Sequence, residues 1–344
     1  MKSTDSELTL RAASLAALAL ALRLSAPAAA AEPAVAKTKW REFEAYRMSD
    51  GRSEAVVVPQ LGGRLVHYGL IGGTNWIWTG EPGSERKEPP LMWGGDKTYI
   101  GPHTMWKFTQ SKVWPPPPPD FAPHEVQLEP EGAASAEPRV LLRTTSTSWP
   151  GYGARVSREY HFEANGDFVT RHSISAVADN PTLAAVWVIT QTIPTEFVFV
   201  PLNPKTPYED GVYWFGFGSP KDQVGATVLS PSLLQIRPVA GTGYKLGAHP
   251  AKPALAAVHR GEAFLQRADP QEGQYPEGAD EAGLSVEVYH HHLPPPGQYT
   301  ELELLSPLRR LDQGATLTTR WNVHPVKAGS ERESIEQLFG LNGG

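Results

Sequence analysis

Residues 154–178 read ARVSREYHFEANGDFVTRHSISAVA, and this stretch decides the fold class. Apolar and polar residues alternate on both sides of the dipeptide Asn165-Gly166. Alternation with a period of two predicts half-buried strands over residues 154–164 and 168–178, and Asn-Gly is a typical turn between two such strands. The stretch therefore predicts an antiparallel β-hairpin.

The turn sets the expected register of this hairpin. Asn165-Gly166 tolerates the positive φ angles of a two-residue type I′ turn. That geometry places Phe162 opposite Val169 and Glu159 opposite His172. An acid beside a histidine can belong to a site, but a solvated cross-strand contact is the commoner role of such a pair, and both interpretations stay open.

The same pattern continues through most of the chain. Further strands, separated by Gly, Pro and Asn, are expected over residues 64–71, 139–149, 184–194, 284–292, 298–306 and 315–323. The C-terminus differs, because Ser330 and Glu333 have the spacing of a helix capping box and Gly340 is a natural helix end. The apolar face of that helix would be Ile335, Leu338 and Phe339. We expect an all-β, predominantly antiparallel fold with one short C-terminal helix.

Composition excludes several classes of protein. The chain has 344 residues, of which 40% are hydrophobic and 9% aromatic, so it can build a sizeable core and is not disordered. It has no cysteine, which excludes disulfides, cysteine-ligated metals and thiol nucleophiles. With a net charge of -6 and no dense basic run, no nucleic-acid partner is expected. Nucleotide-binding, serine-hydrolase and metalloprotease motifs are absent from the sequence, and no cofactor is expected.

Residues 1–31 have the pattern of an export signal. An Ala/Leu-rich stretch over residues 12–22 follows a polar start, and Ala29-Ala30-Ala31 fits a cleavage site. The apolar stretch is shorter than the roughly 20 residues of a membrane span, and no second stretch could serve as one. We expect cleavage near Ala31 and a periplasmic or secreted protein; an unprocessed tail is the alternative.

The rest of the chain is expected to form one domain. Residues 32–41 are predicted to be a linker, residues 42–327 the β domain, and residues 328–344 the helix and tail. Within the domain, residues 94–120 are interpreted as a long insertion outside the sheet that ends in five prolines. Long loops in compact domains are usually functional, so this insertion is the first candidate for the rim of a binding site. The candidate side chains in and beside it are Trp93, Asp96, Lys97, Tyr99, His103, Trp106, Lys107 and Trp114.

Two glutamates lie two residues apart in the predicted strand 298–306. Glu301 and Glu303 would share one face of that strand, while Leu302 and Leu304 would face the core. Two close carboxylates repel each other when both are ionised, which raises one pKa and produces one acid and one base. The alternative is an acidic stripe on a solvated sheet.

The histidines at 290–292 are a weaker signal. Alternation in a strand turns His290 and His292 to one face and His291 to the other. Two imidazoles do not complete a structural zinc site, which takes four ligands. We interpret the run as a polar strand end and expect no metal.

A series of short motifs occurs in a characteristic order. They are Gly62-Gly63-Arg64-Leu65, Gly94-Gly95, Asn165-Gly166, AVWVITQ at 185–191, Tyr244-Lys245-Leu246-Gly247, Tyr275-Pro276, Glu287-Val288-Tyr289 and Glu301-Leu302-Glu303. From about residue 42 to 325 this order resembles the galactose mutarotase-like β-supersandwich proteins, and more closely their uncharacterised DUF4380 branch. The resemblance implies a large two-layered antiparallel β-supersandwich with a sugar site on its concave face.

The resemblance also implies site residues. Aldose 1-epimerases of this superfamily open and reclose a hexose ring, using a Glu as base on the anomeric hydroxyl and a His as acid on the ring oxygen. Their Leu-Glu-Thr-Gln motif lines up best with Leu302-Glu303-Leu304-Leu305, so Glu303 would be the base. Their histidine motif has no counterpart, and His103 is the expected substitute. Substrate contacts are expected from Arg64 and Lys97, which would hold hydroxyls or an acidic sugar, from Gln191, Lys245 and Glu301, and from Trp106 or Trp114 stacking on the ring.

Three functions remain open at this point. The favoured one is an exported carbohydrate-binding protein with aldose 1-epimerase-like activity. The others are a non-catalytic carbohydrate-binding protein of the same fold and a relative of polysaccharide lyases or hydrolases. An imidazole across a groove from Glu303 would favour the enzyme, whereas Glu303 alone would favour the binding protein.

Overall fold

The computed structural model describes residues 34–80, 94–110, 116–131, 139–149, 151–179, 182–278, 281–293 and 297–341. The chain divides into a first unit, Met1–Glu32, and a second unit, Pro33–Gly344. The predicted export signal at residues 1–31 lies outside the described residues and stays a prediction. The fold is that of the second unit.

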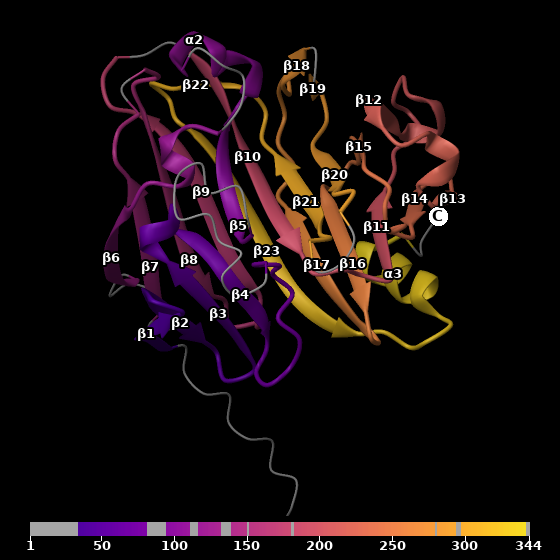
Figure 1. Cartoon of the computed structure of the whole chain (residues 1–344), viewed down its shortest axis with the longest axis horizontal. Coiled ribbons are helices and arrows are strands. Elements are labelled where there is room, and N and C mark those ends of the chain that lie inside the picture. The colour runs from indigo at the N-terminus through magenta and orange to yellow at the C-terminus, as the bar shows by residue number, and fades with distance from the viewer. Residues whose placement is uncertain are drawn as a thin grey trace, which may run out of the picture. The chain divides into compact units, whose positions relative to one another are not determined.

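Two large antiparallel sheets form this unit (Figure 1). As far as the described ranges show, the eleven-stranded sheet has the order β1 (Ala34–Trp40), β2 (Phe43–Ser49), β3 (Ser53–Val58), β4 (Arg64–Leu70), β5 (Asp96–Gly101), β10 (Leu183–Thr192), β21 (Thr300–Leu305), β20 (Val286–His290), β15 (Tyr244–Ala248) and β12 (Tyr213–Gly218), with β22 (Arg309–Arg310) also on β10. The ten-stranded sheet has the order β13 (Ala226–Ser230), β14 (Leu233–Ile236), β11 (Phe197–Pro201), β16 (Ala254–His259), β17 (Glu262–Ala268), β23 (Ala315–Pro325), β9 (Phe168–Ala176), β8 (Ala154–Phe162), β7 (Arg139–Ser146) and β6 (His124–Glu131). A small hairpin, β18 (Glu277–Gly278) with β19 (Glu281–Ala282), and two helices, α2 (Lys107–Gln110) and α3 (Glu331–Phe339), complete the fold. The predicted all-β antiparallel fold is confirmed.

The core lies between the two sheets. Tyr68 from β4 meets Phe168, Phe264 and Trp321 from the ten-stranded sheet, with ring centroids 5.3, 5.5 and 5.3 Å from that of Tyr68. All four side chains are fully buried. Large aromatic rings bury much apolar surface and favour offset or edge-on contacts, so this cluster holds the sheets together face to face.

A buried ion pair also joins the sheets. Asp96 on β5 pairs with Arg158 on β8, and Thr190 Oγ1 donates a hydrogen bond to Asp96 Oδ1 over 2.8 Å. Burial raises the pKa of Asp96 to about 6 despite the neighbouring guanidinium. Removing one partner of a buried pair costs about 3–5 kcal/mol of stability, because a charge is left uncompensated. Since Asp96 points inward, the next residue, Lys97, points to the outer face.

The opening hairpin forms, but its predicted register is wrong by one residue. Glu159 pairs with Arg171 and not with His172. The loop has three residues, 164–166, and only Gly166 among them has a positive φ, of 84°. This is the geometry of a turn followed by a glycine bulge, which Asn-Gly supports as well as it supports a type I′ turn. His172 is consequently buried in the core, and the predicted acid–histidine couple does not form.

Two segments that were expected to lie outside the sheets are strands. Within the predicted linker at 32–41, β1 pairs with β2 at the edge of the eleven-stranded sheet. Its side chains are largely exposed, so it lacks the apolar alternation that marks a strand in the sequence. Within the predicted insertion at 94–120, β5 pairs with β10 and is buried on both faces, which removes the alternation for the opposite reason.

The predicted C-terminal helix is confirmed as α3, which lies near β11 and β16 (Figure 1). The expected capping-box bond from the Ser330 side chain is not formed; Ser334 Oγ instead donates to the Ser330 carbonyl over 2.8 Å. Ile335 and Phe339 are buried against apolar side chains of the ten-stranded sheet. Because α3 shares this core, it is an integral part of the sandwich.

Candidate functional site

The strands β5, β10, β21, β20 and β15 are neighbours in the eleven-stranded sheet (Figure 1). Their outward-facing side chains are largely polar. Their register aligns one row of residues, Lys97, Ile189, Glu303 and Glu287. A second row lies on the same face, two residues further along β10, β21, β20 and β15. It consists of Gln191, Glu301, Tyr289 and Lys245. Leu302 and Leu304 point the other way into the core, as the alternation predicts.

A cavity of about 320 Å³ opens on this face. It is lined by Lys97, Tyr99, Trp187, Ile189, Gln191, Phe217, Lys245, Tyr289, His291, Tyr299, Glu301 and Glu303. The structure therefore brings together five residues to which the sequence assigned a site role: Lys97, Gln191, Lys245, Glu301 and Glu303.

Glu303 is fully buried in the lining of the cavity. Its Oε2 accepts hydrogen bonds from Trp187 Nε1 over 2.6 Å and from Lys245 Nζ over 3.0 Å. Its Oε1 accepts none from the described residues. A buried carboxylate oxygen without a donor is costly, which makes this atom a natural acceptor for a ligand hydroxyl.

Lys245 lies between two carboxylates. Its Nζ is 2.6 Å from Glu287 and 3.0 Å from Glu303. Burial alone would lower the pKa of Lys245, but the two carboxylates outweigh it and raise the pKa above its ordinary value. Burial raises the pKa of Glu287 to about 8, because desolvation exceeds the effect of Lys245. Gly247 permits this packing, since a Cβ there would lie 3.1 Å from Cγ of Glu287.

Glu301 has a different environment on the same strand. Gln191 Nε2 donates to its Oε1 over 2.7 Å, while Oε1 of Gln191 has no partner among the described residues. Burial raises the pKa of Glu301 to about 7; Lys97 opposes this and Glu303 adds to it. A carboxyl group with this pKa holds its proton in about half of the molecules at neutral pH, which suits a general acid.

Aromatic rings form the walls of the cavity. Trp187 contributes its indole, and Phe217, which is 47% exposed, lies in the lining as well. The His291 ring stacks on Tyr299 with centroids 4.7 Å apart, and its Nδ1 is 3.1 Å from the Tyr289 hydroxyl. Burial lowers the pKa of His291, so its imidazole is mostly neutral at pH 7. Aromatic walls with a few polar groups are typical of small-molecule sites.

His103, which the sequence resemblance suggested as the acid, does not lie in the cavity. His103 is buried and does not line the cavity. Its ring contacts that of Trp187, with centroids 5.9 Å apart, and Trp187 in turn binds Glu303. His103 therefore packs against the side chain that binds Glu303 but is not itself part of the cavity lining.

Two further predicted contact residues, Arg64 and Trp106, do not line the cavity. Arg64 is fully buried and pairs with Asp120 over 2.8 Å, so it is not available to a sugar. Trp106 is fully buried, and its Nε1 donates to the Ile100 carbonyl over 2.7 Å, so it cannot stack on a ligand. Trp114 lies outside the described residues, and its role stays a prediction.

Several lining residues were missed in the sequence. These are Trp187, Phe217, Tyr289, His291 and Tyr299. The period of two in the sequence could have placed two of them on the site face. Tyr299 lies two residues before Glu301, and His291 points to the opposite face from its neighbour His290. Phe217 follows an irregularity in the pairing of β12 with β15, so no periodic pattern marks it.

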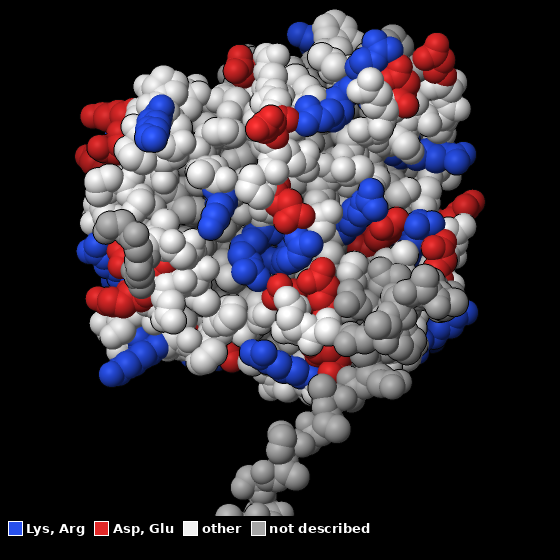
Figure 2. Space-filling model, turned by 180° about the vertical axis from the view of Figure 1, so that it is seen from behind, with Lys and Arg blue, Asp and Glu red and all other residues white. Residues whose placement is uncertain are grey.

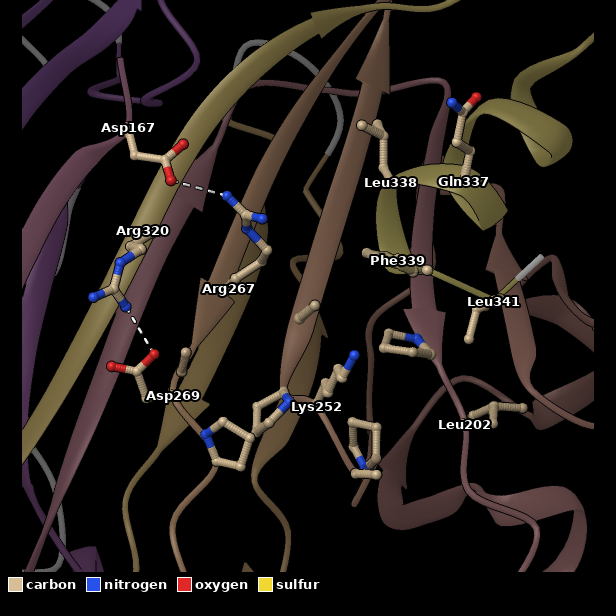
Figure 3. A pocket seen from close by; sticks show the side chains of 18 residues that line it. Asp167, Leu202, Lys252, Arg267, Asp269, Arg320, Gln337, Leu338, Phe339 and Leu341 are labelled. Carbon is tan, nitrogen blue, oxygen red and sulfur yellow. Dashed lines mark hydrogen bonds and ion pairs between the residues drawn. The ribbon is translucent and has the colours of Figure 1, made fainter. Parts of the chain in front are cut away.

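A larger cavity of about 690 Å³ lies beside α3 on the ten-stranded sheet (Figure 3). Four of its five charged side chains bind one another: Arg267 pairs with Asp167 over 3.1 Å and Arg320 with Asp269 over 2.7 Å, while the fifth, Lys252, is exposed. The rest of its lining is mostly proline and aliphatic side chains, and no lining residue has a buried polar atom without a partner among the described residues. Because nothing in it calls for a polar ligand, we assign the candidate site to the smaller cavity.

The surface adds little to the assignment. On the face shown in Figure 2, basic and acidic side chains are interspersed, without an extended area of one sign. In the described part of the chain, no group of three or more His, Asp or Glu side chains could hold a metal ion. No helix in that part is both long and apolar enough to cross a membrane.

No protein-family model and no curated protein matches the chain. Among solved structures, a provisionally named aldose 1-epimerase from Klebsiella pneumoniae subsp. pneumoniae MGH 78578 matches with a TM-score of 0.57 at 12% identity, over 88% of this chain and 84% of its own. A galactose mutarotase-like protein from Lactobacillus casei ATCC 334 matches with a TM-score of 0.51 at 10% identity, over 85% of this chain and 100% of its own. A TPR-domain containing protein from Parabacteroides distasonis ATCC 8503 matches over 83% of this chain, with a TM-score of 0.52 at 13% identity. The matched part is about half, 48%, of the length of that protein.

The fold is therefore that of galactose mutarotase-like proteins, as the sequence resemblance predicts. Identities of 10–13% show the fold and leave the chemistry of the site to its own residues. The narrower DUF4380 branch stays a prediction.

Proposed function

We propose that this protein binds a carbohydrate in the cavity of the eleven-stranded sheet and interconverts its anomers, with Glu303 as base and Glu301 as acid. The observation that supports the proposal most strongly is the pair of buried, unpartnered acceptors in the cavity lining, Oε1 of Glu303 and Oε1 of Gln191. Sugar hydroxyls are donors of the kind that these two oxygens lack. The aromatic walls suit the apolar face of a pyranose ring.

In the proposed reaction, one glutamate takes up one proton and the other gives up one proton. Oε1 of Glu303 takes the proton of the anomeric hydroxyl while Glu301 gives a proton to the ring oxygen, and the bond between the anomeric carbon and the ring oxygen breaks. The open-chain aldehyde forms, its carbonyl face turns, and the reverse transfers close the ring as the other anomer. Glu301 replaces His103 because it is the lining group whose pKa, about 7, matches an acid at neutral pH.

The proposal is tested by the rate at which a hexose or hexuronate equilibrates between its anomers, followed by polarimetry or NMR exchange. Glu303→Gln keeps the size of the side chain but cannot take a proton, so the rate should fall by about 10²- to 10⁴-fold while calorimetry still detects sugar binding. Glu125→Gln, on an exposed position of β6 in the other sheet, is the matched control and should leave the rate unchanged. An unchanged rate in Glu303→Gln would contradict the assignment of the base.

A second function, non-catalytic carbohydrate binding, is favoured by one observation. The histidine expected to act as acid, His103, is not among the residues that line the cavity. If the protein binds sugars but never exceeds the spontaneous rate of anomer exchange with any hexose, hexuronic acid or deoxy sugar, this function replaces the catalytic one. We also propose that residues 1–31 direct export, on the strength of their sequence pattern.

A further inference from the structure

The two lysines of the cavity differ in how their charge is compensated. Lys245 is neutralised by Glu287 and Glu303 at 2.6 and 3.0 Å. Lys97 is only 2% exposed, yet no described residue offers its Nζ a hydrogen bond or an ion pair. Lys97 Nζ lies over the ring of Tyr99, 5.5 Å from the ring centroid.

A buried ammonium group that forms no ion pair is unfavourable. Burial lowers the pKa of Lys97, and the nearby positive charge of Arg64 lowers it further. Glu301, Asp120 and Glu303 oppose this lowering, but the ion pair that Asp120 forms is with Arg64 and not with Lys97. An apolar side chain would pack at this position without that cost, which indicates that the ammonium group is kept for a ligand.

We propose that the natural sugar of this site carries a carboxylate, as a hexuronic acid does, and that Lys97 Nζ binds it. This inference rests on the proposed carbohydrate site and adds the class of substrate. One ammonium group that forms no ion pair with a described residue matches one negative charge. A dianionic phosphate would bring a second negative charge close to Glu301 and Glu303, which lie in the same lining.

The position of Lys97 also fits the geometry of a hexuronic acid. In such a sugar the carboxylate is attached to the ring carbon next to the ring oxygen. Glu301, the proposed donor to the ring oxygen, is influenced by Lys97 more than by any other charge. A sugar with its ring oxygen at Glu301 would thus direct its carboxylate toward Lys97 and its anomeric hydroxyl toward Glu303, two strands from β5 in the same register row.

The test is calorimetry on the full-length protein at pH 7 with glucuronate, galacturonate, glucose, galactose and glucose 6-phosphate. The hexuronates should bind about tenfold or more tightly than the neutral hexoses, since a charge-assisted hydrogen bond contributes at least that factor. Lys97→Met should abolish this preference, so that the hexuronates bind no more tightly than the neutral hexoses, whereas Lys97→Arg should keep it. Lys39→Met, at an exposed position of β1, is the control and should behave as the wild type.

Any of the following results would overturn the inference. Equal affinity for neutral and acidic sugars would remove the role of the carboxylate, and tighter binding of glucose 6-phosphate would replace it by a phosphate. A preference that survives in Lys97→Met would place the anion elsewhere. Absence of binding by all five sugars would overturn the proposed carbohydrate function together with this inference, whereas binding of neutral hexoses alone would overturn the inference and leave the function standing.

Discussion

Glu301 and Glu303 share one face of β21, yet their surroundings separate their roles. Glu303 receives hydrogen bonds from Trp187 and Lys245, whereas Glu301 receives one from the neutral Gln191. Burial raises the pKa of Glu301 to about 7. Two carboxyl groups of identical chemistry can therefore serve as base and acid because the protein solvates them differently.

This difference predicts the pH dependence of anomer interconversion. Glu301 must hold a proton to act as acid, and above pH 7 the protonated fraction falls about tenfold for each pH unit. The ratio kcat/KM should therefore decline above pH about 7, the pKa of Glu301 in the free protein. A pH–rate profile checks this expectation. In Glu301→Gln the remaining rate should no longer decline near that pH; a decline that persists would assign the titration to another group.

At single positions, the sequence predicted those site residues that lie on a strand with a visible period. Glu301 and Glu303 could be placed on one face because Leu302 and Leu304 identify the other. His103 could not be placed, since it follows β5 and its ring packs against that of Trp187, which comes from β10, far along the chain. No local pattern reports such contacts.

At the scale of elements, the opening hairpin shows what local sequence can and cannot specify. Asn165-Gly166 predicts a turn correctly but is compatible with two loop lengths. The structure uses the longer loop, which moves every partner by one residue and sends His172 into the core. The strand β5 was missed because both of its faces are buried, and the linker at 32–41 was assigned where β1 forms because neither face of that strand is well buried.

The observed loop predicts a backbone effect at Gly166. Its φ is 84°, and the nearest atom to a Cβ placed there is 3.7 Å away, so Gly166→Ala should strain the backbone without a steric clash. We expect a loss of about 1 kcal/mol in the free energy of unfolding, measured by urea denaturation. Gly216→Ala is the control: it also has open space around it and lacks a positive φ, so it should change stability much less. Equal effects of the two substitutions would argue against the loop geometry.

For the whole molecule, the all-β antiparallel sandwich and its mutarotase-like fold could be predicted, because strand periodicity and the order of short motifs extend over most of the chain. The pairing order of two large sheets could not, since neighbours such as β5 and β10 are separated by more than 80 residues. The site depends on that order, because its residues come from six adjacent strands, β5, β10, β21, β20, β15 and β12, and from residues next to their ends.

Export is a prediction about the whole chain. The apolar stretch at 12–22 and the alanines at 29–31 predict that a signal peptidase removes residues 1–31, so the mature protein should begin near Glu32. Mass spectrometry of the protein from its native source tests this. A protein that retains Met1 or Lys2 would contradict a periplasmic or secreted location.

The central claim is that the cavity of the eleven-stranded sheet binds a sugar between Glu303 and Glu301. A crystal structure of the protein with a bound hexose or hexuronate tests it most directly. We predict the anomeric hydroxyl within hydrogen-bond distance of Glu303 Oε1, about 2.6–3.2 Å, the ring oxygen facing Glu301, and an aromatic side chain of the lining against the ring. A sugar bound in the larger cavity beside α3, or one in the predicted cavity with its anomeric carbon turned away from Glu303, would contradict the account.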